Sequence, residues 1–162
     1  MAMILEGPLA DRASWRADRC SIGKAMDVIG TRSAILLLRE AYYGTTRFDD
    51  FAERVGITDA VASARLKQLV ELGVLDRRPY REPGKRTRYE YVLTAMGKDL
   101  FPAVLALMQW GDKYLQPDGG PVRVVERQTG APVTIRPRDE AGRELGLDDL
   151  VIVPHDPGPT QG

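Results

Sequence analysis

The feature that most constrains this chain is a change of hydrophobic period at Val74. Before this residue, apolar side chains recur at helical spacing, and two successive helical runs end at Gly56 and Gly73. After it, residues 74–80 and 88–93 alternate between apolar and polar side chains, which is the pattern of half-buried strands. Helices followed at once by a β-hairpin predict a mainly α (α+β) domain with a small sheet.

The two helical runs before Val74 are separated by a tight turn. The shorter run, residues 47–55, carries apolar side chains at i, i+3, i+4 and i+7 and stops at Gly56. Thr58 is the expected N-cap of the next helix, and Asp59 suits its positive first turn. A two-turn helix, a glycine turn and a longer helix form a helix-turn-helix arrangement.

Longer helical runs flank this motif. Residues 20–43 predict a first helix, whose pattern Gly30 interrupts. Thr94 is expected to cap a long helix that reaches Leu115, and its apolar side chains exceed what one small domain buries. This excess predicts a subunit interface, and therefore a homodimer.

The face of the helix after Thr58 that lies opposite its apolar stripe is small and polar. Asp59, Ser63 and Lys67 share that face, because each residue advances about 100° around a helix. A slim face lets a helix backbone approach the floor of the DNA major groove. Ser63 and Lys67 are candidates for base edges or nearby phosphates, and Thr58 for a phosphate at the helix N-terminus. Taken alone, a solvated amphipathic helix in an all-α core is an equally good interpretation.

The loop between the two predicted strands concentrates positive charge. Lys85, Arg86 and Arg88 lie in or beside a turn that Pro83 and Gly84 sharpen. Such cations project to where a phosphate backbone or a minor groove would lie, so the hairpin is interpreted as a wing. A solubilising charged turn is the alternative, and the preceding helix-turn-helix makes it the weaker one.

Arg65 has two interpretations, because it stands at the edge of the apolar stripe. In one interpretation its side chain contacts DNA; in the other it pairs with a carboxylate of the preceding helix, such as Asp50 or Glu53. The residues expected to contact DNA are Arg47, Thr58, Asp59, Ser63, Arg65, Lys67, Arg78, Lys85, Arg86 and Arg88.

The charges and the rare residue types limit the classes of function. The net charge of the 162 residues is zero, yet residues 1–116 hold 18 Lys and Arg against 15 Asp and Glu, and residues 117–162 hold 5 against 8. Cys20 and His155 each stand alone, so no internal disulfide, metal site, cofactor or catalytic triad is expected. An enzyme has little support, since no nucleophile with a base partner is visible. The chain has no apolar run long enough for a bilayer and no signal-peptide pattern, and a cytoplasmic, nucleoid-associated protein is expected.

Four segments are expected along the chain. They are an N-terminal arm making a dimer contact (1–19), a DNA-binding domain with its dimerisation helix (20–116), a β-rich extension (117–154) and a disordered tail (155–162). The extension should contain a β-hairpin over residues 122–136, with its turn at Thr129–Gly130, and a strand within 147–154.

Over roughly residues 20–114 the chain resembles the HxlR family of bacterial winged-helix regulators. The resemblance is carried by Cys20 before a helix containing IG and ending LLREAYYG, then by RFDDFAERVGI, RLKQLVELGVLDRRPY and RYEYVLTAMGKDLFPAVLALMQWGDKY. It implies a homodimer that binds a pseudo-palindromic operator in double-stranded DNA with two recognition helices and two wings, as a repressor or other transcriptional regulator.

The resemblance also bears on sensing. It implies that Cys20 occupies the position where some members detect oxidants or electrophiles, although a small buried hydrophobe is the more ordinary role for such a residue. Two residues depart from the family pattern: Ser33 stands where Trp is usual, and Ala62 where Leu is usual. The first departure opens a ligand pocket near Ser33, or Trp15 or Trp110 fills the space. An alternative function is therefore a redox- or small-molecule-sensing regulator in which Cys20 or that pocket controls DNA release.

Overall fold

A computed structural model of the protein describes residues 2–13 and 20–155. Two compact units are formed, one from the described residues of 1–20 and 134–162, and the other from 21–133. The predicted disordered tail lies outside the described residues apart from His155. None of the described helices combines the length and the apolar character that a membrane crossing requires.

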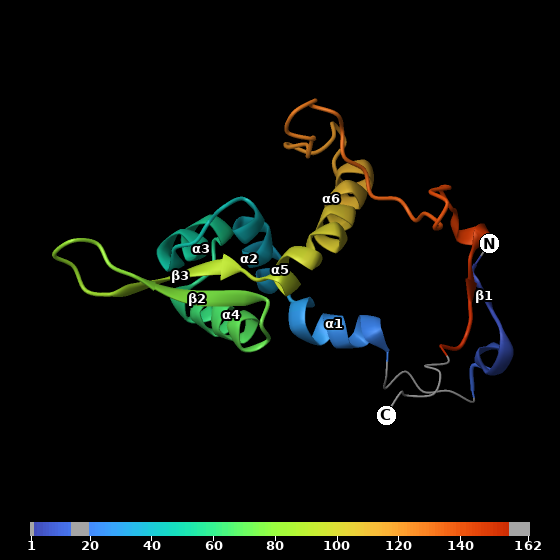
Figure 1. Ribbon diagram of the computed structural model, residues 1–162, viewed down its shortest axis with the longest axis horizontal. Coiled ribbons are helices and arrows are strands. Elements are labelled where there is room, and N and C mark those ends of the chain that lie inside the picture. The colour runs from blue at the N-terminus through green and yellow to red at the C-terminus, as the bar shows by residue number, and fades with distance from the viewer. Residues whose placement is uncertain (1, 14–19, 156–162) are drawn as a thin grey trace. The chain divides into compact units, whose positions relative to one another are not determined.

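The larger unit holds most of the secondary structure, and the predicted mainly α fold with a small sheet and a wing is confirmed (Figure 1). Strands β2 and β3 pair antiparallel, with Leu75 opposite Leu93 and Tyr80 opposite Arg88. The elements of this unit are α1 Ser21–Ile29, α2 Arg32–Tyr42, α3 Phe48–Val55, α4 Asp59–Glu71, β2 Leu75–Tyr80, β3 Arg88–Leu93, α5 Ala95–Asp99 and α6 Phe101–Leu115.

The two long predicted helices are each broken into two, so those predictions were wrong. The first run stops before Gly30, where a Cβ atom would overlap the carbonyl oxygen of Met26, and Thr31 then caps α2 by accepting a hydrogen bond from the Ala34 N–H at 3.2 Å. The second run breaks at Leu100. Pro102, with no N–H to donate, fits only the first turn of the helix that follows.

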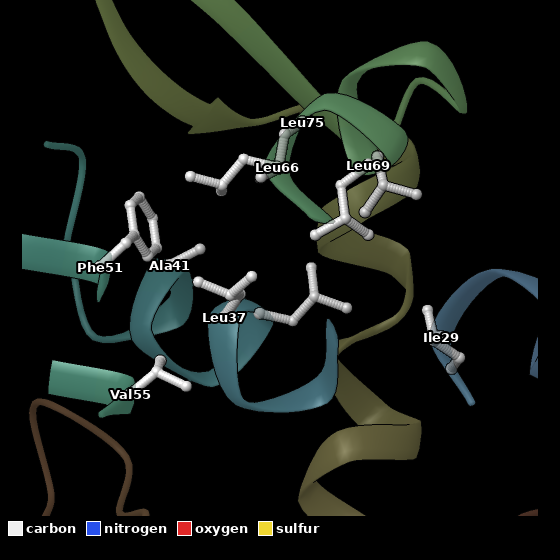
Figure 2. Packing of buried hydrophobic residues seen from close by; sticks show 10 residues of the cluster. Ile29, Leu37, Ala41, Phe51, Val55, Leu66, Leu69 and Leu75 are labelled. Atoms are coloured by element: carbon white, nitrogen blue, oxygen red, sulfur yellow. The ribbon is translucent and has the colours of Figure 1, made fainter. Parts of the chain in front are cut away.

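The core of this unit is built on α2. Leu37 lies between side chains of α3 and α4, including Phe51 and Leu66 (Figure 2), and all three are fully buried. Leu69 and Leu75 extend the same cluster to the first strand. Full burial of a Leu or Phe side chain contributes about 1.5–3 kcal/mol, so this contact fixes which face of α4 points outward.

Tyr42 joins the end of α2 to α5 and α6. Its hydroxyl donates a hydrogen bond to the Gly97 carbonyl oxygen at 2.7 Å, and its ring meets Phe101 edge-on with centroids 5.1 Å apart. Burial disfavours the phenolate and raises the pKa of Tyr42 to about 12.

Replacing Tyr42 by phenylalanine is expected to lower the free energy of unfolding by about 1 kcal/mol at neutral pH, because a half-buried hydrogen bond is lost. The difference from the unchanged protein should shrink above pH 10. The pKa of Tyr42 is about 10 in the unfolded chain and about 12 in the folded protein. The stabilisation by neutral Tyr42 is therefore complete below pH 10. It is lost as the pH rises through 12. Urea unfolding of both proteins at pH 8 and pH 11 measures this, with the exposed Tyr43→Phe as control. A difference that stays constant with pH contradicts the assignment.

The smaller unit contains a short parallel pair that the sequence did not predict. Strand β1, Ile4–Leu5, pairs with β4, Val151–Ile152, and the 3-10 helices η1, Gly7–Ala10, and η3, Leu147–Asp149, lie beside them in sequence. The strand expected within 147–154 is therefore limited to two residues, and its partner comes from the N-terminal arm.

The hairpin expected over residues 122–136 is reduced to a tight turn with one bridge, between Val125 and Pro132. The turn itself forms as predicted, since the Gly130 N–H donates to the Glu126 carbonyl oxygen at 2.9 Å. The Glu126 carboxylate accepts from the backbone N–H groups of residues 128 and 129 and from the Thr129 hydroxyl, and these hydrogen bonds lower the pKa of Glu126. Pro132 has no N–H to donate, which limits a longer ladder.

Candidate nucleic-acid interface

Helix α4 is positioned by its N-cap and by its buried stripe. The Thr58 hydroxyl oxygen accepts a hydrogen bond from the Val61 N–H at 3.3 Å, and Asp59 lies in the positive first turn. With Ala62, Leu66 and Leu69 buried, the opposite face is turned to solvent. The exposed residues on that side include Thr58, Asp59, Ser63 and Lys67.

The loop of the wing, residues 81–87, is exposed throughout and extends past α3 and α4 (Figure 1). It is held as a turn, because the Lys85 N–H donates to the Glu82 carbonyl oxygen at 3.0 Å and the Arg81 Nε donates to the Lys85 carbonyl oxygen at 3.2 Å. Lys85 Nζ also lies 2.6 Å from a Glu82 carboxylate oxygen, and this hydrogen bond and charge lower the pKa of Glu82. Arg86 and Arg88 remain as exposed cations.

Arg47 ties the wing to the helix-turn-helix. Its backbone forms a bridge with Glu90 of β3, and the neighbouring Tyr91 N–H donates to the Thr46 carbonyl oxygen at 2.8 Å. The Arg47 guanidinium stacks on the Tyr80 ring, with 3.3 Å from Cζ to the ring centroid. One terminal nitrogen, Nη1, is buried without a hydrogen-bond partner among the described residues. Arg47 therefore joins the start of α3 to both strands of the wing.

A hollow of about 660 Å³ lies between the wing and the start of α3, and Ser63 lines it from α4. Arg88 lines it from the wing, and Arg47 from the residue that precedes α3. A second hollow, of about 350 Å³, continues along α4 from Ser63 to Lys67. The first hollow also contains three carboxylates, Asp49, Asp50 and Glu82, so its charge is mixed rather than uniformly positive.

Two of the predicted contact residues make side-chain contacts within their own elements. Arg78 pairs with Asp76 on its own strand, Nε to Oδ2 at 3.0 Å, and lines neither hollow. Arg65 donates to the Gln68 side-chain oxygen at 2.8 Å, so of its two interpretations the pairing with Asp50 or Glu53 is not the contact that forms. The partner comes from the same helix, three residues on, where i and i+3 side chains are neighbours.

Arg77 is a residue of this surface that the sequence reasoning missed. It stacks on the Tyr89 ring, 3.7 Å from Cζ to the centroid, and it lines both hollows. A signal was present, because strand side chains alternate in direction and Leu75 is buried toward the helices. Arg77, two residues later, points to the same side as Leu75, whereas Arg78 points away.

Cys20 precedes α1 and is half-buried. Its role as a sensor stays a prediction. Ser33 is half-buried at the start of α2, with its hydroxyl 3.4 Å from that of Thr31. Within residues 2–13 and 20–155, His, Cys, Asp and Glu side chains form no group of three that could hold a metal ion.

The family model described as HxlR-like helix-turn-helix matches residues 28–119, which include α2 to α6, the wing and both hollows. The chain belongs to this family. As an HxlR-like protein it is a DNA-binding transcriptional regulator. It is 44% identical over 118 residues to the uncharacterized HTH-type transcriptional regulator MT3179 of Mycobacterium tuberculosis, covering 72% of this chain and 73% of that one.

Solved structures similar to this HxlR-like chain differ in how much of it they cover. PA1607, a candidate transcription factor, has a TM-score of 0.75 at 36% identity and covers 83% of this chain and 94% of its own. The reduced redox regulator HypR has a TM-score of 0.52 at 29% identity and covers 57% of this chain and 90% of its own. The additional coverage by PA1607 shows that it also shares structure outside the winged helix.

Proposed function

We propose that two copies of this regulator bind a pseudo-palindromic operator in double-stranded DNA and repress transcription at the nucleoid in the cytoplasm. The observation that carries the proposal is the hollow that Ser63 of α4, Arg47 before α3 and Arg88 of the wing line together. Helix α4 enters the major groove with its Ser63 face, and the wing loop lies along the adjacent phosphates or minor groove. The proposed contact residues are Arg47, Thr58, Asp59, Ser63, Arg65, Lys67, Arg77, Arg78, Lys85, Arg86 and Arg88.

Exposed apolar side chains support the dimer. On α6, Leu107, Trp110 and Tyr114 are 55%, 56% and 60% exposed, and on α1 Ile22 is 74% exposed. Apolar residues gathered on one helix face in water favour association, and a C2 dimer would bury the same surface on both copies. The two recognition helices of a dimer then read the two half-sites of a palindrome.

Replacing Arg86 and Arg88 together by alanine is expected to weaken DNA binding and flatten its dependence on salt. Each lost phosphate contact lowers the slope of log affinity against log salt by about 0.9. The measurement is fluorescence anisotropy with a duplex taken from beside the protein's own gene, titrated at several salt concentrations. Lys98→Ala removes one exposed cation from α5 and should leave the slope unchanged. Equal slopes for the double variant and the unchanged protein contradict a wing contact with phosphates.

A redox-controlled regulator is the second candidate, favoured by the similarity to the redox regulator HypR and by a half-buried thiol before α1. In this alternative, an oxidant such as diamide takes two hydrogens from the Cys20 thiols of two copies, and the disulfide that these sulfurs form releases DNA. Diamide treatment should then weaken DNA binding by the unchanged protein and leave Cys20→Ser unaffected. An equal response of both proteins to diamide contradicts the thiol mechanism.

A further inference from the structure

An apolar cavity of about 330 Å³ lies between α2 and α6, beneath the segment that follows α6. Leu36 and Tyr42 line it from α2, and Phe101 and Leu105 from α6, while Val124 belongs to the covering segment. The residues of α2 that line the cavity lie nearer the C-terminal end of this helix than Ser33 does. Its volume is near the lower end of the range of small-molecule sites, about 300–1,000 Å³, and such sites have mostly hydrophobic and aromatic walls with a few polar groups.

The polar groups of the cavity leave one uncompensated negative charge. Arg39 lines the cavity, but its Nε and Nη2 both donate to the Glu40 carboxylate, at 3.0 and 2.7 Å, and Glu40 is only 5% exposed. This pair is therefore neutral as a unit. Asp112 is half-buried on α6, and no hydrogen bond or ion pair reaches its carboxylate from the residues that the structure describes.

The position of the Asp112 carboxylate depends on Gly120. A Cβ atom at Gly120 would overlap the Asp112 carboxylate, so a larger residue there would displace it. The glycine therefore leaves room for the acid at the edge of the cavity. The aromatic pair Tyr42 and Phe101 lines the cavity further toward the start of α6.

We propose that this cavity binds a lipophilic organic cation, a flat aromatic ring system of about two fused rings that carries one ammonium group. The rings would be buried against the apolar wall, and the ammonium would donate a hydrogen bond to Asp112. A half-buried carboxylate attracts a cation more strongly than a fully exposed one does, because water screens it less.

Occupancy of this site bears on the recognition helix, because α2 packs against α3 and α4 on one side and against α6 on the other. A ligand that binds one arrangement of α2 and α6 more tightly than another shifts the population toward it. Binding itself does not depend on the proposed DNA contacts, so the test needs no DNA and can fail independently of the proposed function.

Isothermal titration calorimetry of the full chain with three probes of one shape tests the proposal: naphthylmethylammonium, naphthylmethanol and naphthoate. The cation should bind about tenfold more tightly than the neutral probe, and the anion most weakly, because only the cation adds an opposite charge to the hydrogen bond with the Asp112 carboxylate. Asp112→Asn should remove the preference for the cation. Asp118→Asn, the same change at an exposed acid that does not line the cavity, should preserve it.

A second variant and a second measurement complete the test. Gly120→Ala should weaken cation binding by displacing the carboxylate, while the neutral probe binds as before. Sedimentation velocity with and without the cation should give the same oligomeric state. The proposal is overturned if the three probes bind equally, if none of them binds, or if Asp112→Asn keeps the preference for the cation. It is also overturned if the cation dissociates a dimer, since that result would show that a second copy occupies the cavity.

Discussion

Replacing Ser63 by glutamate is expected to lower the affinity for operator DNA at least about a hundredfold, because a like charge placed against phosphates costs several kcal/mol. Ser63 is exposed on the outer face of α4 and lines both hollows, so its side chain stands where the proposed contact requires close approach. The free energy of unfolding should change by no more than about 0.5 kcal/mol, since an exposed helix position tolerates glutamate. Anisotropy titration and urea unfolding of the same preparation measure the two effects.

Two variants separate the possible causes of this loss. Gln116→Glu adds the same charge at the exposed end of α6 and should change the affinity less than about threefold, because exposed charges far from the duplex are screened. Ser63→Ala keeps the face small. It should lower the affinity less than about tenfold, which is the loss expected when one hydrogen bond is removed. If Ser63→Glu binds like Gln116→Glu, the outer face of α4 does not approach DNA.

The helix-turn-helix was predictable because its signals are local. Gly56 adopts a left-handed conformation, φ 70° and ψ 42°, which ends α3, and Thr58 caps α4 two residues later. Neither feature depends on distant parts of the chain. The outward face of α4 followed from helical periodicity alone, so Ser63 and Lys67 could be named before any coordinates were known.

The breaks in the long helices were harder to predict. A glycine within a helix costs only about 1 kcal/mol relative to alanine, so Gly30 was compatible with one helix or two. The pairing of β1 with β4 was not predictable, because two-residue strands carry no periodic signal and their partners are separated by nearly the whole chain. Long-range pairing is decided by tertiary contacts rather than by local pattern.

The site shows the same division between local and distant information. Ser63 and the wing cations follow from their own segments, whereas the lining of the hollow also includes Arg47, from the segment before α3, which stacks on Tyr80 of the wing. Its role depends on a contact across 33 positions in sequence. The engagement of Arg78 with Asp76 likewise needs side-chain conformations that a sequence pattern does not give.

Replacing Leu66 by alanine is expected to lower the free energy of unfolding by about 2–5 kcal/mol, because it leaves a cavity in a close-packed core. Leu66 is 0% exposed and belongs to the cluster that joins α2, α3 and α4 (Figure 2). Domains of this size are stable by only about 5–15 kcal/mol, so a large share of the total would be lost. Lys67→Ala is the matched control at the next position. Its side chain is 75% exposed and its ion pair with Glu71 spans 3.7 Å, so it should change stability by less than about 0.5 kcal/mol.

The same pair of variants separates stability from recognition, since the two residues point to opposite sides of one helix. Leu66→Ala should bind DNA with an affinity, per folded molecule, within about threefold of the unchanged protein, because the outer face keeps its side chains. Lys67→Ala should fold normally and lose about one unit of salt slope if Lys67 contacts a phosphate. Urea unfolding gives the folded fraction of each variant, and anisotropy at several salt concentrations gives the slope. A Leu66→Ala protein as stable as the original contradicts the burial of this face of α4 in the core, and a Lys67→Ala protein with an unchanged slope contradicts a contact of Lys67 with a phosphate.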